Sequence, residues 1–136
     1  MIVGTGIDVI EITRVERALR RSGERFARRV FAASEILDCR SRRRSGPHFA
    51  MRFAAKEAVM KALGTGWAGG VRWVDIEIVS ASSESPDRLS LRLHGRVAEL
   101  AELGFNRIVF GLPSADADVV MPLLDRYATI GHALQG

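Results

Sequence analysis

The chain has 136 residues, of which 47% are hydrophobic and 26% are charged, proportions that are ordinary for a soluble globular protein. This length suits one domain with a small core, so we expect a single domain over residues 1–136. No apolar run is long enough to cross a bilayer and no basic-then-apolar leader opens the chain. We therefore expect neither a membrane segment nor a secretory signal.

Basic residues outnumber acidic ones, and the formal net charge of +4 predicts acidic partners. On charge alone, nucleic acid, anionic lipid, a nucleotide and an acidic protein all stay open. The single cysteine, Cys39, cannot form a disulfide within the chain, which fits a reducing compartment and predicts a cytoplasmic location. Nothing in the sequence around Cys39 marks a base beside it, so we do not expect a catalytic nucleophile there.

An apolar segment at the start of the chain, Ile2–Ile10, predicts a strand that is interrupted by Gly4 and Gly6. Asp8 stands inside this segment. A buried, unpaired aspartate costs free energy, so Asp8 should lie at a strand end, at the surface or on a cation. The alternative that its carboxylate caps the following helix is equally open at this point.

A basic helix is predicted over residues 14–29, with Thr13 as its N-cap and Glu16 as the capping-box partner. The Ser-Gly pair at residues 22–23 should break or bend this helix. The helix is the most basic part of the chain, with arginines at positions 14, 17, 20, 21, 25, 28 and 29.

A second helix is predicted from Ser34 to about residue 40, followed by arginines 42–44 and the turn residues Gly46 and Pro47. Plain solvation of the charged faces is one interpretation of these two helices. Another is docking of an acidic helix from a partner protein, in which case association would weaken with salt. Nucleic acid is less favoured, because no aromatic residues are interleaved with the arginines and no nucleic-acid-binding module is recognisable.

The stretch Arg52–Gly66 predicts a central helix that ends near Leu63, before two glycines. Helical spacing divides it into a core face and a second face. Glu57 and Lys61 are spaced for a solvated ion pair. However, Lys56 and Lys61 are the only lysines of the chain, and a lysine suits a site that must follow a moving phosphate. The core face should carry Ala55, Val59, Ala62 and Leu63, and the second face Phe53, Glu57 and Lys61.

The rest of the chain predicts further strands and one short helix. Leucines at alternate positions from 89 to 93 should face inward. Pro113 should end the strand before it, and Pro122 places the segment 119–124 at a sheet edge or in a turn. The predicted elements are strands over 75–80, 88–94 and 108–112 and a helix over 95–104.

Two stretches, GTGIDVIEITRVE at the start and RFAAKEAVMKALGTG in the middle, resemble the holo-[acyl-carrier-protein] synthases, a small bacterial branch of the 4'-phosphopantetheinyl transferases. An early G-x-D strand paired with a later K-E-A-x-x-K helix carries this resemblance, which covers residues 1 to about 104. The resemblance implies an α+β fold in which a small antiparallel sheet packs with a central helix. It also implies a homotrimer with each active site at a subunit interface.

The resemblance assigns roles to three side chains of the two motifs. Asp8 and Glu57 match the two magnesium-binding carboxylates of the family, and Lys61 matches the lysine that contacts the phosphates of coenzyme A. Magnesium takes one or two carboxylates with phosphate oxygens and waters, so these residue types suit transfer of the 4'-phosphopantetheine arm of coenzyme A to a serine of an apo acyl carrier protein, releasing 3',5'-ADP. Glu57 acting through a metal-bound water is our preferred base for the serine proton, and a water alone is the alternative.

Further residues are expected to bind the two substrates. The carrier protein would serve fatty acid or polyketide synthesis, and we expect no nucleic acid or membrane partner. The expected residues are Arg52, Gly64 and Gly66, with Lys61, for coenzyme A, and Arg14, Arg17 and Arg21 for docking of the carrier protein.

The C-terminal third departs from the family pattern. Asp87 and Arg88 precede Leu89 where many members have a Gly-Lys/Arg-Pro turn, residues 110–114 lack a histidine, and Pro122 interrupts the closing segment. The alternative to an active transferase is therefore a degenerate member that binds coenzyme A or a carrier protein without turnover.

Overall fold

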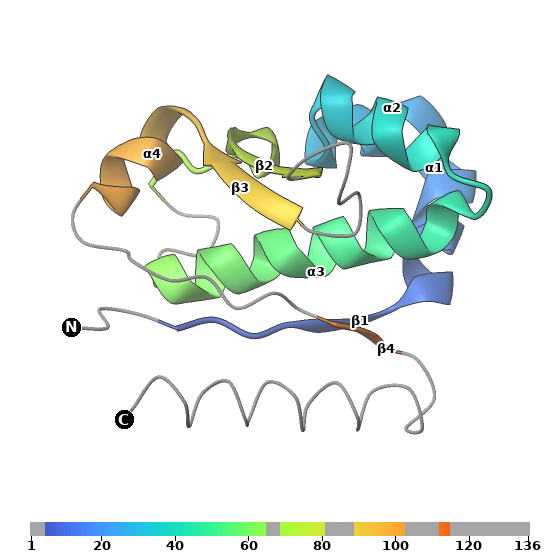
Figure 1. The fold of residues 1–136 in the computed structure, drawn as a ribbon, viewed down its shortest axis with the longest axis horizontal. Coiled ribbons are helices and arrows are strands. Elements are labelled where there is room, and N and C mark those ends of the chain that lie inside the picture. Colours follow the sequence, from blue (N-terminus) through green and yellow to red (C-terminus); the bar gives the residue numbers. More distant parts are fainter. Residues whose placement is uncertain (1–4, 65–68, 81–88, 103–111, 115–136) are drawn as a thin grey trace.

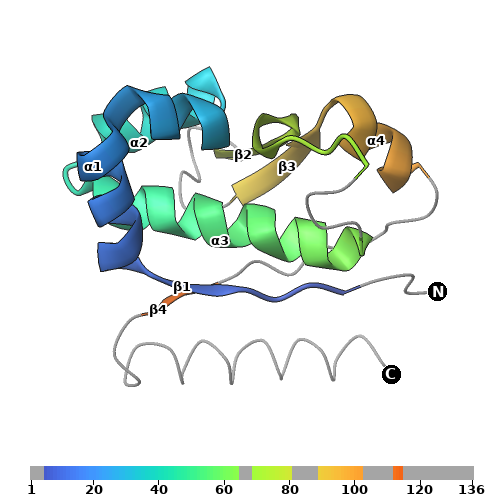
Figure 2. The same ribbon diagram turned by 180° about the vertical axis from the view of Figure 1, so that it is seen from behind.

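The computed structural model of the chain describes residues 5–64, 69–80, 89–102 and 112–114. The long helix α3 (Ser45–Leu63) lies at the centre of the fold. Strands β1 and β4 run along one side of α3, and β2, β3 and α4 lie on its opposite side, as Figure 1 and Figure 2 show from two directions. The other elements are β1 (Val9–Glu11), α1 (Ile12–Val30), α2 (Ala33–Ser41), η1 (Trp73–Asp75), β2 (Ile76–Ser80), β3 (Leu89–Leu93), α4 (Gly95–Ala101) and β4 (Leu112–Ser114).

The central helix begins at Ser45 rather than at Arg52. Pro47 lies in its first turn, where the missing N–H removes no intrahelical hydrogen bond, so the turn predicted at Gly46 and Pro47 is wrong. The C-terminal end is as predicted, because Gly64 follows with a left-handed φ of 69°. Neither α3 nor any other helix of the described residues has the length and apolarity that crossing a bilayer requires.

Helix α1 confirms the predicted basic helix and its break. Gly23 interrupts it with φ 51° and ψ −133°, a backbone conformation that favours glycine. The predicted N-cap is wrong: the cap is Glu11, and Thr13 lies inside the first turn, where its hydroxyl donates to the Glu11 carboxylate. The helix therefore starts directly after β1, which brings the first turn close to Asp8.

Strands β2 and β3 form an antiparallel ladder in which Ile76 pairs with Leu93 and Ile78 with Leu91. The alternate leucines of β3 are partly buried against a cluster that includes Met60 of α3, as the spacing predicted. Arg92, between them, is exposed. The predicted small antiparallel sheet packed with a central helix is thereby confirmed.

Strands β1 and β4 pair in parallel, with Ile10 opposite Pro113. The N-terminal strand is thus shorter than the predicted Ile2–Ile10. Pro113 does not end a strand but lies inside β4, which a proline tolerates where its missing N–H is not needed by the ladder. The predicted segment 119–124 lies outside the described residues.

Two buried clusters flank α3. In the first, between α1, α2 and the start of α3, the rings of Phe31 and Phe49 lie 4.9 Å apart. The second lies between the end of α3, the β2–β3 hairpin and α4. Of the predicted core face, Ala55 and Val59 are buried at 0% and 3% exposure, whereas Ala62 and Leu63 are only partly buried. Burial on both sides fixes the rotation of α3 about its axis, and so fixes which side chains face β1.

Candidate active site

The N-terminal segment meets the end of α3 through Asp8 and Lys61. The Nζ atom of Lys61 lies 2.6 Å from Oδ1 of Asp8 and 3.1 Å from the carbonyl oxygen of Ile7. Asp8 stands just before β1, and the N-cap of α1 is Glu11, so the helix-capping alternative for Asp8 is wrong. Asp8 instead pairs with a cationic side chain, the ammonium of Lys61, which is one of the three environments that its sequence context predicted.

Glu57 lies one helical turn before Lys61 and lines the same hollow as Asp8, a space of about 380 Å³. Burial, followed by the negative charge of Asp8, raises the pKa of the Glu57 carboxyl, while the positive charge of Lys61 partly offsets that rise. The two carboxylates therefore act on each other electrostatically. The hollow is lined by Asp8, Val9, Ile10, Arg14, Val15, Ala18, Phe26, Phe53 and Glu57.

The donor set of this hollow fits a hard divalent cation. Within the described residues, no group of three His, Cys, Asp or Glu side chains could hold a metal ion. Asp8 and Glu57 supply two carboxylates, the number that Mg²⁺ usually takes when substrate phosphates and waters complete its coordination. A protein site that raises the pKa of one carboxylate by the charge of another is also stabilised by a cation between them.

Arginines of α1 border the hollow. Arg14 lines it, and a neighbouring hollow of about 430 Å³ is lined by Arg14, Arg17 and Arg21 together with two small residues. All three arginines are exposed. The structure thus places the three predicted docking residues on one surface of α1, beside Asp8 and Glu57.

A larger groove of about 860 Å³ adjoins the hollow, because Phe26 and Phe53 line both. The ring centroids of Phe53 and Trp73 lie 4.7 Å apart. Trp73, the first residue of η1, also lines the groove. Arg28 and Arg29 of α1 also line the groove. Its lining therefore combines aromatic rings with positive charge.

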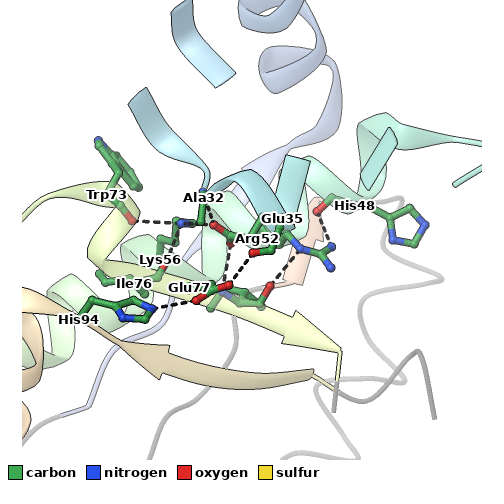
Figure 3. Close-up of polar contacts among 11 residues, drawn as sticks. Ala32, Glu35, His48, Arg52, Lys56, Trp73, Ile76, Glu77 and His94 are labelled. Atoms are coloured by element: carbon green, nitrogen blue, oxygen red, sulfur yellow. Dashed lines mark hydrogen bonds and ion pairs between the residues drawn. The ribbon is translucent and has the colours of Figure 1, made fainter. Parts of the chain in front are cut away.

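The residues predicted for coenzyme A are not all in this region. Arg52 is 1% exposed, with Nη2 2.5 Å from Asp38 Oδ2 and Nε 3.3 Å from the carbonyl oxygen of Ile78. Its guanidinium thus bonds to α2 and β2. Figure 3 shows it beside the carbonyl oxygen of His48, on the same helix. Gly64 ends α3 three residues after Lys61, and Gly66 lies outside the described residues.

Sequence reasoning missed a buried ion pair behind the site. The Nζ atom of Lys56 lies 2.7 Å from Glu35 Oε2, and both side chains are 0% exposed. The ammonium also donates to the carbonyl oxygens of Trp73, at 3.0 Å, and Ile76, at 2.5 Å (Figure 3). Glu35 in turn accepts from the backbone N–H of Ile78, which ties α2 to β2. Burial lowers the pKa of Lys56, and the charge of Glu35 opposes that shift.

A second missed contact lies on the edge of this network. Glu77 of β2 accepts a hydrogen bond from the hydroxyl of Ser34 at 2.5 Å and contacts Nε2 of His94 at 2.8 Å. These two partners lower the pKa of Glu77. The side chain of His94 is half exposed, so this contact lies at the surface of the network. No local sequence pattern connects these residues with their partners, which lie 17 to 43 positions away along the chain.

The sequence of the chain matches that of a known protein family. The sequence profile of the 4'-phosphopantetheinyl transferase superfamily matches residues 4–108. The chain therefore belongs to the 4'-phosphopantetheinyl transferase superfamily.

Its relatives within that superfamily are holo-[acyl-carrier-protein] synthases. The chain is 42% identical to the one from Geotalea daltonii over 125 residues, which cover 91% of this chain and 97% of the relative. It is 50% identical to the one from Methylorubrum populi over 99 residues, covering 73% and 71%. It belongs with these synthases, as the two motifs implied.

Solved structures agree in fold. The synthase of Neisseria meningitidis superposes with a TM-score of 0.66 at 32% identity, covering 79% of this chain and 84% of that one. The Bacillus anthracis synthase, solved in complex with CoA (3',5'-ADP), superposes with a TM-score of 0.59 at 35% identity, covering 70% and 78%. The implied α+β fold is thus confirmed.

Proposed function

We propose that this chain transfers the 4'-phosphopantetheine arm of coenzyme A to a serine of an apo acyl carrier protein, as a holo-[acyl-carrier-protein] synthase. The observation that carries the proposal is the meeting of Asp8, Glu57 and Lys61 from two distant segments of a chain that belongs to this family. Related synthases have been solved in complex with coenzyme A, which supports it as the donor.

Asp8 and Glu57 would hold Mg²⁺, the cation that the family resemblance implies. The bound ion would offset negative charge on the pyrophosphate of coenzyme A as the transferred phosphoryl group moves. Lys61 is 52% exposed, so its flexible side chain can turn from Asp8 to a phosphate oxygen. Gly64, at the C-terminal end of the same helix, and Gly66 are proposed to border the phosphates. Arg52 is left out of this site, because it is buried against Asp38.

Glu57 is the proposed general base. The serine oxygen forms a bond to phosphorus, the bond from phosphorus to the 3',5'-ADP oxygen breaks, and the serine proton passes through a water to Glu57. A general base works best when its pKa lies near the working pH. Burial and the charge of Asp8 raise the pKa of Glu57 in the metal-free protein, and a cation bound to both carboxylates would oppose that rise.

Arg14, Arg17 and Arg21 are proposed to dock the carrier protein beside the hollow. Their shared exposed surface would attract an acidic helix and raise the association rate at low salt. The adjoining groove, which Phe26 and Phe53 line, would take apolar side chains of the same partner.

A homotrimer in the cytoplasm, built from single-domain subunits of residues 1–136, is the assembly that we propose. The family resemblance supports it. So does the exposure of Ile7 and Val9, at 64% and 56%, on either side of Asp8, because large apolar side chains beside a site are covered when subunits meet. Sedimentation at several concentrations would test the assembly.

The test of function is to mix the protein with coenzyme A, Mg²⁺ and an apo acyl carrier protein, and to measure the carrier's mass. Addition of one phosphopantetheine group is the expected result. Binding of coenzyme A with no mass gain on several carriers would favour the degenerate alternative. That alternative is motivated by the departures of the C-terminal third from the family pattern, a part of the chain that includes Pro113, opposite Ile10 of β1.

A further inference from the structure

Gly6 lies against the backbone of α3, two residues before Asp8. A Cβ atom built on Gly6 would lie 1.8 Å from the carbonyl oxygen of Ala58 and 2.8 Å from the backbone nitrogen of Ala62. Both obstacles are main-chain atoms of a helix with buried neighbours, so neither can rotate away as a side chain would. Gly6 itself is buried. The close approach of the two backbones therefore depends on the missing side chain.

This contact falls at the turn of α3 that carries the proposed site. Ala58 directly follows Glu57, and Ala62 directly follows Lys61. From the other side, the Lys61 ammonium bonds the Asp8 carboxylate at 2.6 Å. The depth at which Gly6 sits on the helix thus sets how far Asp8 reaches toward the other two groups.

We infer that Gly6 is a positioning residue, whose lack of a side chain sets the distance of the Asp8 carboxylate from Glu57 and Lys61. The inference rests on the proposed function, since a misplaced Asp8 should show as weaker binding of the divalent cation. Real Cβ atoms are essentially never found within 3.0 Å of such neighbours. An alanine would push the segment outward by roughly 1 Å, a misplacement that can cost on the order of 100-fold in a positioned reaction.

The requirement at Gly6 is for space and not for an unusual backbone angle. Gly6 is absent from the glycines with positive φ, whereas Gly64, which has one, would meet nothing within 4 Å. Gly46 offers the matched control. The three atoms nearest to its Cβ would all belong to the side chain of Glu16, a flexible carboxylate that can swing aside, at the opposite end of α3 from Lys61.

The first experiment compares Gly6→Ala, Gly46→Ala and the native protein with coenzyme A bound. Electron paramagnetic resonance of Mn²⁺ measures the dissociation constant of the cation, and circular dichroism measures folding. Gly6→Ala should weaken Mn²⁺ binding by about 10- to 100-fold, while Gly46→Ala leaves it unchanged. Native Mn²⁺ affinity in Gly6→Ala would overturn the inference. So would a chain that no longer folds, because the inference predicts a displaced segment on an intact core.

A second experiment separates positioning from general damage. Asp8→Glu lengthens the carboxylate arm by one methylene, which should weaken Mn²⁺ binding in the native background but restore part of it in Gly6→Ala. Non-additivity of this kind is what a double-mutant cycle measures between coupled groups. Simply additive losses would overturn the inference. If the native protein bound no Mn²⁺ at all, the proposed function itself would fail, and this inference with it.

Discussion

The ammonium nitrogen of Lys61 lies 2.6 Å from a carboxylate oxygen of Asp8, a residue 53 positions earlier in the chain. The side chains are 52% and 16% exposed, so the pair adds only about 0 to 1 kcal/mol to stability. The Lys61 ammonium is already paired with the Asp8 carboxylate. Nearby, burial and the charge of Asp8 raise the pKa of the Glu57 carboxyl.

Lys61→Met should change the binding of Mn²⁺ and of coenzyme A in opposite directions. In the free protein the lysine competes with a divalent cation for Asp8, so its removal should tighten Mn²⁺ binding by up to about fivefold, or ~1 kcal/mol. Coenzyme A should bind more weakly, because the lysine ammonium that is proposed to contact its phosphates is lost. Separate calorimetric titrations with each ligand measure both effects, and Lys61→Arg serves as the charge-conserving control. Unchanged binding of both ligands would contradict the role of Lys61.

Asp8→Asn and Glu57→Gln should each lower the transfer rate by at least about 100-fold, since each removes a proposed ligand of the cation that would offset charge at the reacting phosphate. Excess Mg²⁺ should not restore either rate fully. Glu99→Gln, an exposed carboxylate of α4, is the control and should transfer normally. Near-native rates in both site variants would remove the metal assignment.

Glu57→Gln should also stabilise the free protein at neutral pH. The pKa of Glu57 is raised from 4.5 by burial and by Asp8, so the folded state holds the proton more tightly than the unfolded state does. Stability from this group is therefore lost as pH rises from 4.5 through the folded pKa. Thermal unfolding should show a higher midpoint for Glu57→Gln at about pH 7 and no difference at about pH 4. Equal unfolding midpoints for the native protein and Glu57→Gln at both pH values would show that the ionised Glu57 carboxylate does not destabilise the fold.

Lys56→Met should destabilise the fold strongly. It leaves the Glu35 carboxylate buried without its cation, a loss of about 3 to 5 kcal/mol in comparable pairs. Replacing both residues, as Lys56→Met with Glu35→Gln, should recover part of that loss. Urea unfolding measures the free energies. A single variant as stable as the native protein would mean that the pair contributes nothing.

Arg14→Glu should raise the KM for the carrier protein at low salt, with coenzyme A binding unchanged, because the substitution reverses a charge on the proposed docking surface. The difference from native should shrink as salt screens the surface. Arg96→Glu on α4 reverses an equally exposed charge far from α1 and should leave KM unchanged. Identical salt profiles for native and Arg14→Glu would contradict the docking assignment.

The sequence predicted elements well where local signals agree. Gly23 and Gly64 marked a helix break and a helix end, because both adopt backbone angles that other residues avoid. The start of α3 was mispredicted, since Pro47 is favourable in a first turn and equally typical of a turn between helices. Only packing against α1 and α2 decides between these two uses.

The resemblance named Asp8, Glu57 and Lys61, which the structure brings together, but the sequence did not indicate what surrounds them. The ion pair of Lys56 with Glu35 joins two residues 21 positions apart that no local pattern connects. Arg52 shows the opposite failure: a charged residue in a motif suggested ligand binding, and tertiary packing directs it to Asp38. Long-range partners of buried charges are set by the fold as a whole.

The proposed transfer requires that Asp8 and Glu57 share one divalent cation. The most direct test is a crystal structure of the protein with Mn²⁺ and coenzyme A, in which anomalous scattering locates the metal. We predict a peak within bonding distance of both carboxylates and of a phosphate oxygen, with Lys61 turned toward the phosphates. A metal bound elsewhere, or coenzyme A bound in this hollow with the Lys61–Asp8 pair intact and no metal beside it, would contradict the account.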